Sequence, residues 1–171
     1  MIRKQLAVAA GMGAAAIMLI VFWQHLAGLP LPLPDGNDQA ARLAFVAHWL
    51  LLPGLALLAG IGAVANQRFF VADAIDGGRS PGGWFLEVTL RYNQNTLEQI
   101  VLAAIAWSGL ALVLPHERLG LIPGLAVLFF AGRIIFWIGY LLAPVGRAFG
   151  LGLTAYPTFA ALFWLAWRLL S

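Results

Sequence analysis

Five long apolar stretches constrain most strongly how this chain can fold. Each reaches or approaches the roughly 20 residues that an α-helix needs to cross a bilayer. They are Gln5–Ala27, Ala41–Asn66, Val88–Leu114, Ile122–Ala143 and Ala148–Leu169. Of the 171 residues, 62% are hydrophobic and 10% are charged, whereas soluble domains carry about 25% charged residues. The pattern predicts an all-α, multi-pass integral membrane protein whose outer surface is covered by lipid.

The first stretch could be either a signal peptide or a retained helix. Arg3 and Lys4 precede it, as basic residues precede the apolar region of a signal peptide. The stretch is longer than such a region, however, and no clear small-x-small cleavage site follows it. We therefore predict a retained transmembrane helix. Residues 1–40 form an N-terminal helix and loop, and residues 41–171 form a four-helix membrane domain.

The links between the spans predict where helices begin, and the flanking charges predict how the chain is oriented across the membrane. Asp38 is a good N-cap candidate for the second stretch, and the longest link runs over residues 67–86. The basic residues on the N-terminal side are Arg3, Lys4, Arg68, Arg79 and Arg147, and those on the other side are Arg42, Arg118 and Arg168. This modest excess predicts a cytoplasmic N-terminus. Small residues predict close helix approach at Gly11, Gly13, Gly60 and Gly62.

The composition excludes several kinds of chemistry. The chain has no cysteine, so it has no disulfide, thiolate metal site or thiol nucleophile of its own. Any thiol chemistry would need a thiol brought in by a ligand. The net charge is +3 and the basic residues are scattered, so we expect no nucleic-acid partner. The three histidines lack metal-ligand spacing, and no metal site is predicted.

Charged residues lie within the predicted spans although each costs about 2.5–3.5 kcal/mol at mid-bilayer on insertion scales. Arg91, Glu98 and Arg133 are of this kind, and we expect such residues to face the bundle interior and to pair with one another or with a ligand. At about 100° per residue, Glu87, Arg91, Asn95 and Glu98 lie within about 80° of one another. These four residues are predicted to form one polar stripe.

Other polar residues converge on the same membrane face. Arg133 and Tyr140 are seven residues apart and share one helix face. Consecutive spans run antiparallel, so Arg91 at the start of the third span and Tyr140 near the end of the fourth reach one level. Arg68 and Arg147 arrive at that level from the second and fifth spans. The convergence predicts a binding site.

A structural and a functional interpretation of these residues compete. A buried ion-pair network or snorkelling at helix ends would explain a single arginine, and for one isolated residue we favour that interpretation. The whole set holds more carboxylate, amide, phenol and guanidinium groups than helix pairing requires. It suits a small anionic, peptide-like ligand: guanidiniums for carboxylates, Glu98 for an ammonium and Asn95 for a backbone amide.

These residues resemble the MAPEG family, the membrane-associated proteins in eicosanoid and glutathione metabolism. Its members include microsomal glutathione transferases, a leukotriene synthase and the microsomal prostaglandin E synthase. A Glu-x3-Arg-x3-Asn-x2-Glu pattern on the family's second helix is matched by Glu87, Arg91, Asn95 and Glu98. The family's third helix has an Arg followed seven residues later by a Tyr, and the leukotriene synthase has a further Arg seven residues on. Those positions are Arg133, Tyr140 and Arg147.

The resemblance covers the chain from Ala41 to the C-terminus and implies a function. Family members are four-helix protomers that assemble as homotrimers and bind glutathione between neighbouring subunits at the cytoplasmic end. Carried over residue by residue, the glutathione-binding or pocket-supporting set is Arg68, Glu87, Arg91, Asn95, Glu98, Arg133 and Tyr140. We expect Arg147, helped by the Tyr140 hydroxyl, to stabilise the glutathione thiolate. This thiolate would then attack a lipophilic electrophile or hydroperoxide that arrives from the bilayer.

Departures from the family pattern leave the second substrate open. The Gln5–Ala27 helix has no counterpart in the four-helix pattern. Leu102 stands where family members often have Pro, Val88 where Arg is common, and Phe136 where the eicosanoid enzymes have a polar residue.

Two other functions remain open from the sequence. One is a non-catalytic member that keeps the pocket for folding or assembly. The other is a transporter or proton relay that uses Glu98 and the arginines. A relay would need polar residues across the whole bundle, whereas Ile100–Leu114 and Leu125–Phe130 are almost entirely apolar.

Overall fold

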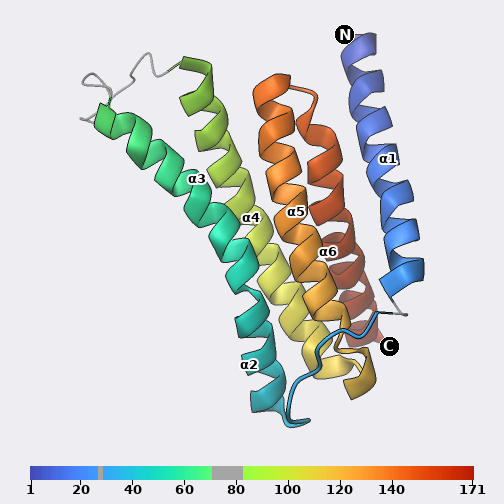
Figure 1. Cartoon of the computed structure of the whole chain (residues 1–171). Coiled ribbons are helices and arrows are strands. Elements are labelled where there is room, and N and C mark those ends of the chain that lie inside the picture. Colours follow the sequence, from blue (N-terminus) through green and yellow to red (C-terminus); the bar gives the residue numbers. More distant parts are fainter. Residues whose placement is uncertain (27–28, 71–82) are drawn as a thin grey trace.

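The structure is a computed structural model that describes residues 1–26, 29–70 and 83–171. These residues form a helical bundle (Figure 1). Its elements are α1 (Ile2–Leu26), α2 (Gln39–Trp49), α3 (Leu51–Phe70), α4 (Gly83–Val113), the short 3-10 helix η2 (His116–Arg118), α5 (Leu121–Leu142) and α6 (Arg147–Leu170). Within the described ranges, five helical segments are long and apolar enough to cross a membrane. The predicted all-α transmembrane bundle, with one helix preceding a four-helix core, is confirmed.

The second predicted span is broken in the structure. We expected one helix over 41–66, but α2 ends at Trp49 and α3 begins at Leu51. Pro53 accounts for the break, because it has no amide hydrogen to donate to the Trp49 carbonyl and its ring crowds that oxygen. The two helices continue along one membrane span with a bend between them (Figure 1).

The link between the second and third spans is shorter than the sequence predicts. Helix α3 continues to Phe70 and α4 begins at Gly83, so Arg68 and Glu87 both lie inside helices. Residues 71–82, which include Arg79, lie outside the described residues. The prediction that Arg79 adds to the basic charge of the N-terminal side therefore stays a prediction.

A polar clamp connects α2 to the end of α4 at the face away from the N-terminus. The Asp38 side chain accepts a hydrogen bond from the Ala41 amide at 3.0 Å, which confirms the predicted N-cap. Arg42 Nη1 donates to the carbonyl oxygens of Ala111 and Leu114, each at 2.7 Å. Carbonyls in the last turn of a helix have no partner within the helix, so Arg42 supplies one.

Glycine allows α5 and α6 to approach closely. A Cβ atom added at Gly150 would overlap the backbone nitrogen of Phe136 and lie 2.6 Å from the Gly132 carbonyl oxygen. Because these atoms belong to the backbone, no change of rotamer relieves the overlap. The contact brings Arg133, the residue that follows Gly132, directly against α6.

The additional helix α1 lies along α6 (Figure 1). A Cβ atom at Gly11 would lie 3.1 Å from the Ala148 Cβ, and one at Gly152 would lie 2.6 Å from the Cβ of Ala15. Ala15 is completely buried. Small residues on both helices thus let the two backbones approach, as is common between membrane helices.

The four glycines that we predicted at helix contacts divide evenly. Gly11 is tightly packed against α6, and a Cβ atom at Gly60 would overlap the Asn93 side chain, so two predictions are confirmed. Nothing lies within 4 Å of a Cβ at Gly13 or Gly62, so the other two are wrong for a single chain. A glycine in an apolar sequence does not show by itself which side of its helix is covered.

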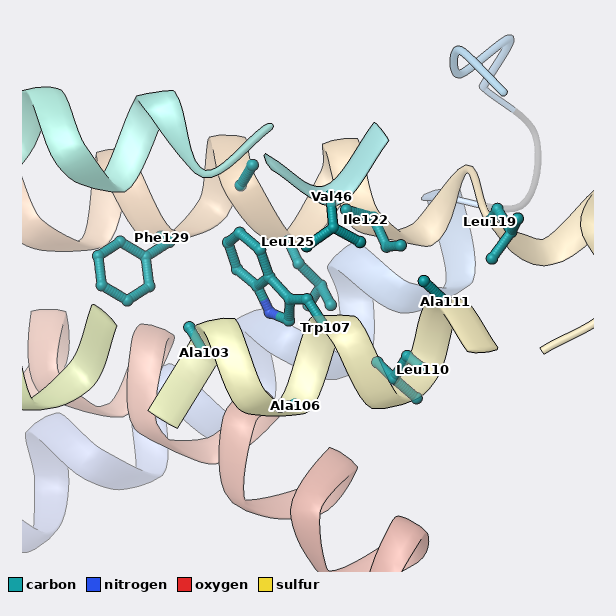
Figure 2. Close-up of a cluster of buried hydrophobic side chains, with 11 residues drawn as sticks. Val46, Ala103, Ala106, Trp107, Leu110, Ala111, Leu119, Ile122, Leu125 and Phe129 are labelled. Carbon is teal, nitrogen blue, oxygen red and sulfur yellow. The ribbon is translucent and has the colours of Figure 1, made fainter. Parts of the chain in front are cut away.

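An apolar core is formed by side chains from α2, the second half of α4 and the first half of α5. These segments lie in the half of the bundle that is remote from the N-terminus (Figure 1). Figure 2 shows Val46 of α2, Trp107 of α4 and Leu125 of α5 converging there. The Trp107 ring meets the Phe129 ring edge to face, with centroids 6.2 Å apart. The polar residues of the sequence motifs lie in the other half.

Candidate functional site

Polar side chains from α4, α5 and α6 contact one another where α4 begins, α5 ends and α6 begins. These three helix ends lie on the side of the bundle that holds the N-terminus (Figure 1). We call Glu87, Arg91, Tyr140 and Arg147 the outer tier. Arg91 Nη1 donates to the Tyr140 hydroxyl oxygen at 3.1 Å, and Arg91 Nη2 pairs with Glu87 Oε1 at 2.5 Å. The Arg147 guanidinium lies over the Tyr140 ring, 4.5 Å from its centroid. The predicted convergence of Arg91, Tyr140 and Arg147 is thus present.

The local sequence explains this geometry. Glu87 and Arg91 are four residues apart, so they are neighbours on successive turns of α4. Tyr140 lies in the last turn of α5, and Arg147 is the first residue of α6. A Cβ atom at Gly139 would overlap the backbone oxygen of Gly146. The α5–α6 turn can therefore fold tightly, and it returns Arg147 over Tyr140.

Trp84 supports the outer tier, and sequence reasoning missed it. Its indole Nε1 donates to the Leu141 carbonyl oxygen at 3.0 Å, and its ring meets Tyr140 edge to face at 6.0 Å. Tryptophan near the end of a span is usually an interfacial anchor, so its residue type did not indicate this role. The only indication was its place one helical turn before Glu87.

One turn deeper lies a second polar group, the inner tier of Asn95, Arg133, Gly150 and Thr154. Asn95 follows Arg91 by four residues, which places it about 6 Å further along α4. Arg133 Nη1 donates to Asn95 Oδ1 at 2.8 Å, and Arg133 Nη2 donates to Thr154 Oγ1 at 2.6 Å and to the Gly150 oxygen at 3.5 Å. One guanidinium therefore connects α4, α5 and α6.

Arg133 is completely buried. Its guanidinium carbon lies 4.6 Å from the centroid of the Phe136 ring, so an aromatic face shares in stabilising the charge. Among the described residues no carboxylate pairs with it. Thr154 and Gly150 were not predicted. The indication for Thr154 was its place seven residues after Arg147, on the same face of α6.

Glu98 and Gln94 lie on the outer face of α4. Both are exposed, and Gln94 Nε2 donates to Glu98 Oε1 at 2.8 Å. Arg91 and Glu87 are also exposed, with 58% and 54% of their side-chain surfaces accessible. The expectation that charged residues within spans face the bundle interior thus holds for Arg133 and is wrong for Arg91 and Glu98 within a single chain.

The predicted single stripe on α4 is divided because neighbouring helices cover only part of it. Helix α3 covers one side, where the Tyr92 hydroxyl donates to the Ala56 oxygen at 2.8 Å. Helix α5 covers another, where Arg133 reaches Asn95. Glu98 lies on the side of α4 left uncovered by the described helices.

Arg68 is placed apart from both tiers. It lies in the last turn of α3, half-buried, and α3 diverges from α4 toward this end (Figure 1). No hydrogen bond or ion pair joins it to the tier residues in the described part of the chain. A single protomer therefore does not bring Arg68 to the site as the sequence predicts.

The two tiers carry an excess of positive charge in the half of the bundle nearer the N-terminus. Arg91, Arg133 and Arg147 contribute three guanidiniums and Glu87 one carboxylate, which favours an anionic ligand. The buried polar residues of α4 extend as far as Gln99. Beyond it the core side chains of α4 are Ala103, Ala106, Trp107, Leu110 and Ala111. A polar path for ion transport would have to cross this apolar core.

Comparison with known proteins places most of the chain in one family. The family model described as MAPEG family matches residues 42–170. Transmembrane protein 79 of Bos taurus is 25% identical over 163 residues, which are 95% of this chain and 41% of that protein. Transmembrane protein 79 of Mus musculus is 32% identical over 79 residues, which are 46% of this chain and 20% of that protein. No solved structure matches the chain.

The extents of these matches differ at the N-terminus. The family model begins after α1, but the bovine match takes in 163 of the 171 residues and so includes most of the 25-residue α1. The chain spans about two fifths of the length of that relative. Most of the α1 segment therefore lies within the bovine match although it lies outside the family model.

Proposed function

The chain belongs to the MAPEG family, and on that basis we propose that it binds glutathione at the two tiers and uses the bound thiol on lipophilic electrophiles or hydroperoxides. The observation that carries the proposal is the contact between the two family motifs in space. Arg91 of the first motif bonds Tyr140 of the second, and Arg133 of the second bonds Asn95 of the first. Residues matched by spacing alone thus form one polar cluster.

The chemistry of the cluster suits this ligand. Glutathione carries two carboxylates, one ammonium group and two peptide groups. The exposed guanidinium of Arg91 can bind a carboxylate through two parallel hydrogen bonds. Glu98 is exposed and can accept from the ammonium. The surplus positive charge of the tiers complements the net negative charge of the tripeptide.

The exposed face of α4 supports a site between copies of the chain. Each charge left toward lipid at mid-bilayer costs about 2.5–3.5 kcal/mol on insertion scales, and Glu98 lies halfway along the 31-residue α4. A neighbouring copy together with bound glutathione would cover Glu87, Arg91 and Glu98. In such an assembly, a homotrimer by family resemblance, Arg68 of one copy can serve the site of the next.

Arg147 is the residue suited to activating the thiol. A cysteine thiol has a pKa of about 8.5, so unbound glutathione is mostly protonated at pH 7. Lowering that pKa by two units takes about 2.7 kcal/mol of preferential stabilisation of the thiolate. Arg147 is exposed yet held over Tyr140. Tyr140 contacts both arginines, since its hydroxyl accepts a hydrogen bond from Arg91 and its ring lies beneath the Arg147 guanidinium.

A non-catalytic role within the same family is the second candidate. The inner tier is bonded within one protomer, with Arg133 fully buried, as a purely structural network would be. Phe136 also stands where the eicosanoid enzymes of the family have a polar residue. In this case the pocket would serve folding or assembly, and no turnover would follow binding.

Calorimetry and a turnover assay separate the candidates. Purified protein in detergent is titrated with glutathione and then assayed with several hydrophobic electrophiles and one lipid hydroperoxide. We expect saturable heat on titration, a raised unfolding temperature and turnover above background. Binding without turnover on any of these substrates would favour the non-catalytic role. If titration produces no heat and glutathione does not raise the unfolding temperature, the proposal that the chain binds glutathione is wrong.

A further inference from the structure

The amide of Asn95 is held in one orientation. Asn95 Oδ1 lies 2.8 Å from Arg133 Nη1. A guanidinium has only N–H donors and no acceptor, so the amide atom that faces it has to be the oxygen. This assignment follows from the chemistry of the pair and does not depend on telling the amide oxygen and nitrogen apart by shape.

Arg133 cannot turn away to release the amide. Its side chain has no exposed surface, and its other terminal nitrogen donates to Thr154 Oγ1 at 2.6 Å. The guanidinium also lies over the Phe136 ring at 4.6 Å. With the Oδ1 atom of the half-buried Asn95 bonded on its Arg133 side, the Nδ2 amino group is the part left to meet a ligand.

We propose that Arg133 is a positioning residue that makes Asn95 an obligatory hydrogen-bond donor in the ligand site. Asn95 then binds a carbonyl or carboxylate oxygen of the ligand and selects against a peptide N–H. The proposal rests on the proposed function, since it specifies which atoms of glutathione face Asn95. It refines the expectation that Asn95 meets a backbone amide by choosing between the two groups of that amide.

The fixed orientation has a consequence for selectivity. A freely rotating asparagine could serve either a donor or an acceptor on the ligand, whereas this one leaves its amino group unpaired unless an acceptor is present. Glu98 lies three residues further along α4, and its ionised carboxylate can only accept hydrogen bonds. The two side chains therefore require an acceptor and a donor at separate places on the ligand.

The substitution Asn95→Asp tests the proposal. Aspartate keeps an oxygen toward Arg133 and adds an ion pair, so the unfolding temperature is expected to equal or exceed that of the wild type. The change removes both N–H donors and turns a second carboxylate oxygen toward the ligand. We expect the dissociation constant for glutathione, measured by calorimetry at pH 7.5, to rise at least tenfold, about the loss of one hydrogen bond to a charged group.

Asn37→Asp is the matched control. Asn37 Oδ1 also accepts from an arginine, from Nε and Nη2 of Arg42 at 3.1 and 2.5 Å, but it lies at the opposite membrane face. This variant undergoes the same chemical change and is expected to bind glutathione within about twofold of the wild type.

Each result of the titrations has a distinct meaning. Equal binding by the wild type and Asn95→Asp would overturn the inference and leave the proposed function standing. A large fall in the unfolding temperature of Asn95→Asp would overturn it too, because an oxygen facing Arg133 would be preserved in that variant. A wild type that does not bind glutathione would remove the proposed function and the inference together.

A glutathione ester identifies the acceptor. The monoethyl ester of the glycine carboxylate is titrated against the wild type and Asn95→Asp. If Asn95 donates to that carboxylate, the losses from the ester and from the substitution do not multiply, because both remove one contact. If Asn95 donates to a peptide carbonyl, the two losses multiply. Once the loss of affinity in Asn95→Asp has established the donor role, this comparison distinguishes the glycine carboxylate from a peptide carbonyl as the acceptor.

Discussion

Replacing Arg147 by alanine is expected to lower the rate of glutathione conjugation about 25-fold at pH 7. The exposed guanidinium over Tyr140 is assigned to the thiolate, and its loss returns the thiol pKa from about 6.5 to about 8.5. The thiolate fraction at pH 7 then falls from about three quarters to about 3%. Glutathione affinity is expected to change less, because Arg91 and Asn95 remain.

The loss of activity in Arg147→Ala is expected to become smaller as the pH rises. The thiolate fraction of the variant rises with pH, so the difference from the wild type shrinks to less than about twofold at pH 9. Turnover and thiolate absorbance are measured from pH 6 to 9. Arg168→Ala is the control, since Arg168 is also on α6 and also lies over an aromatic ring, that of Trp164, but at the other end of the helix. Equal losses of binding and turnover, constant over pH, would rule out the role assigned to Arg147.

Replacing Arg133 by alanine is expected to lower the unfolding free energy by about 3–5 kcal/mol, because a cavity opens and Asn95 Oδ1 loses its partner. For a chain of this size the loss corresponds to a fall of roughly 10 °C in unfolding temperature. The prediction follows from the complete burial of Arg133 and from its bonds to two other helices. Circular dichroism of the purified protein in detergent measures it.

Two further variants separate packing from hydrogen bonding. Arg133→Met refills much of the space without the hydrogen bonds, so it is expected to recover part of the lost stability. Arg118→Ala removes an exposed arginine from η2 and is expected to change the unfolding temperature little. If Arg133→Ala unfolded within about 1 °C of the wild type, the inner tier would not hold the three helices together.

The sequence predicted the membrane spans well, for a physical reason. A bilayer requires about 20 apolar residues per helix, and this requirement leaves a pattern that is independent of tertiary structure. It did not predict the break at Leu50, because the stretch that contains Pro53 remains apolar overall and its mean hydropathy does not reveal the proline. The length of α4 was also underestimated, since the helix begins at Gly83, five residues before the predicted span.

The sequence predicted the composition of the site better than its geometry. Spacing predicted that Arg91 and Tyr140 reach one level, and the two side chains are hydrogen-bonded. It did not predict the hydrogen bond between Arg133 and Asn95. It could not show that Asn95 turns inward while Glu98 stays exposed, because the two differ by only about 60° around α4. The position of α5 decides between them. Trp84, Gly150 and Thr154 were missed because their partners come from distant turns or from the backbone.

A structure of the protein with glutathione in a lipid bilayer tests the central claim most directly. Electron cryomicroscopy in lipid nanodiscs can show how many copies assemble and where the tripeptide lies. We expect a trimer with glutathione between adjacent copies, its oxygens beside Arg91 and Asn95 and its sulfur toward Arg147. If Arg91 and Glu98 instead face lipid and glutathione is absent from the cleft between copies, the tiers are structural and the proposed enzyme does not exist.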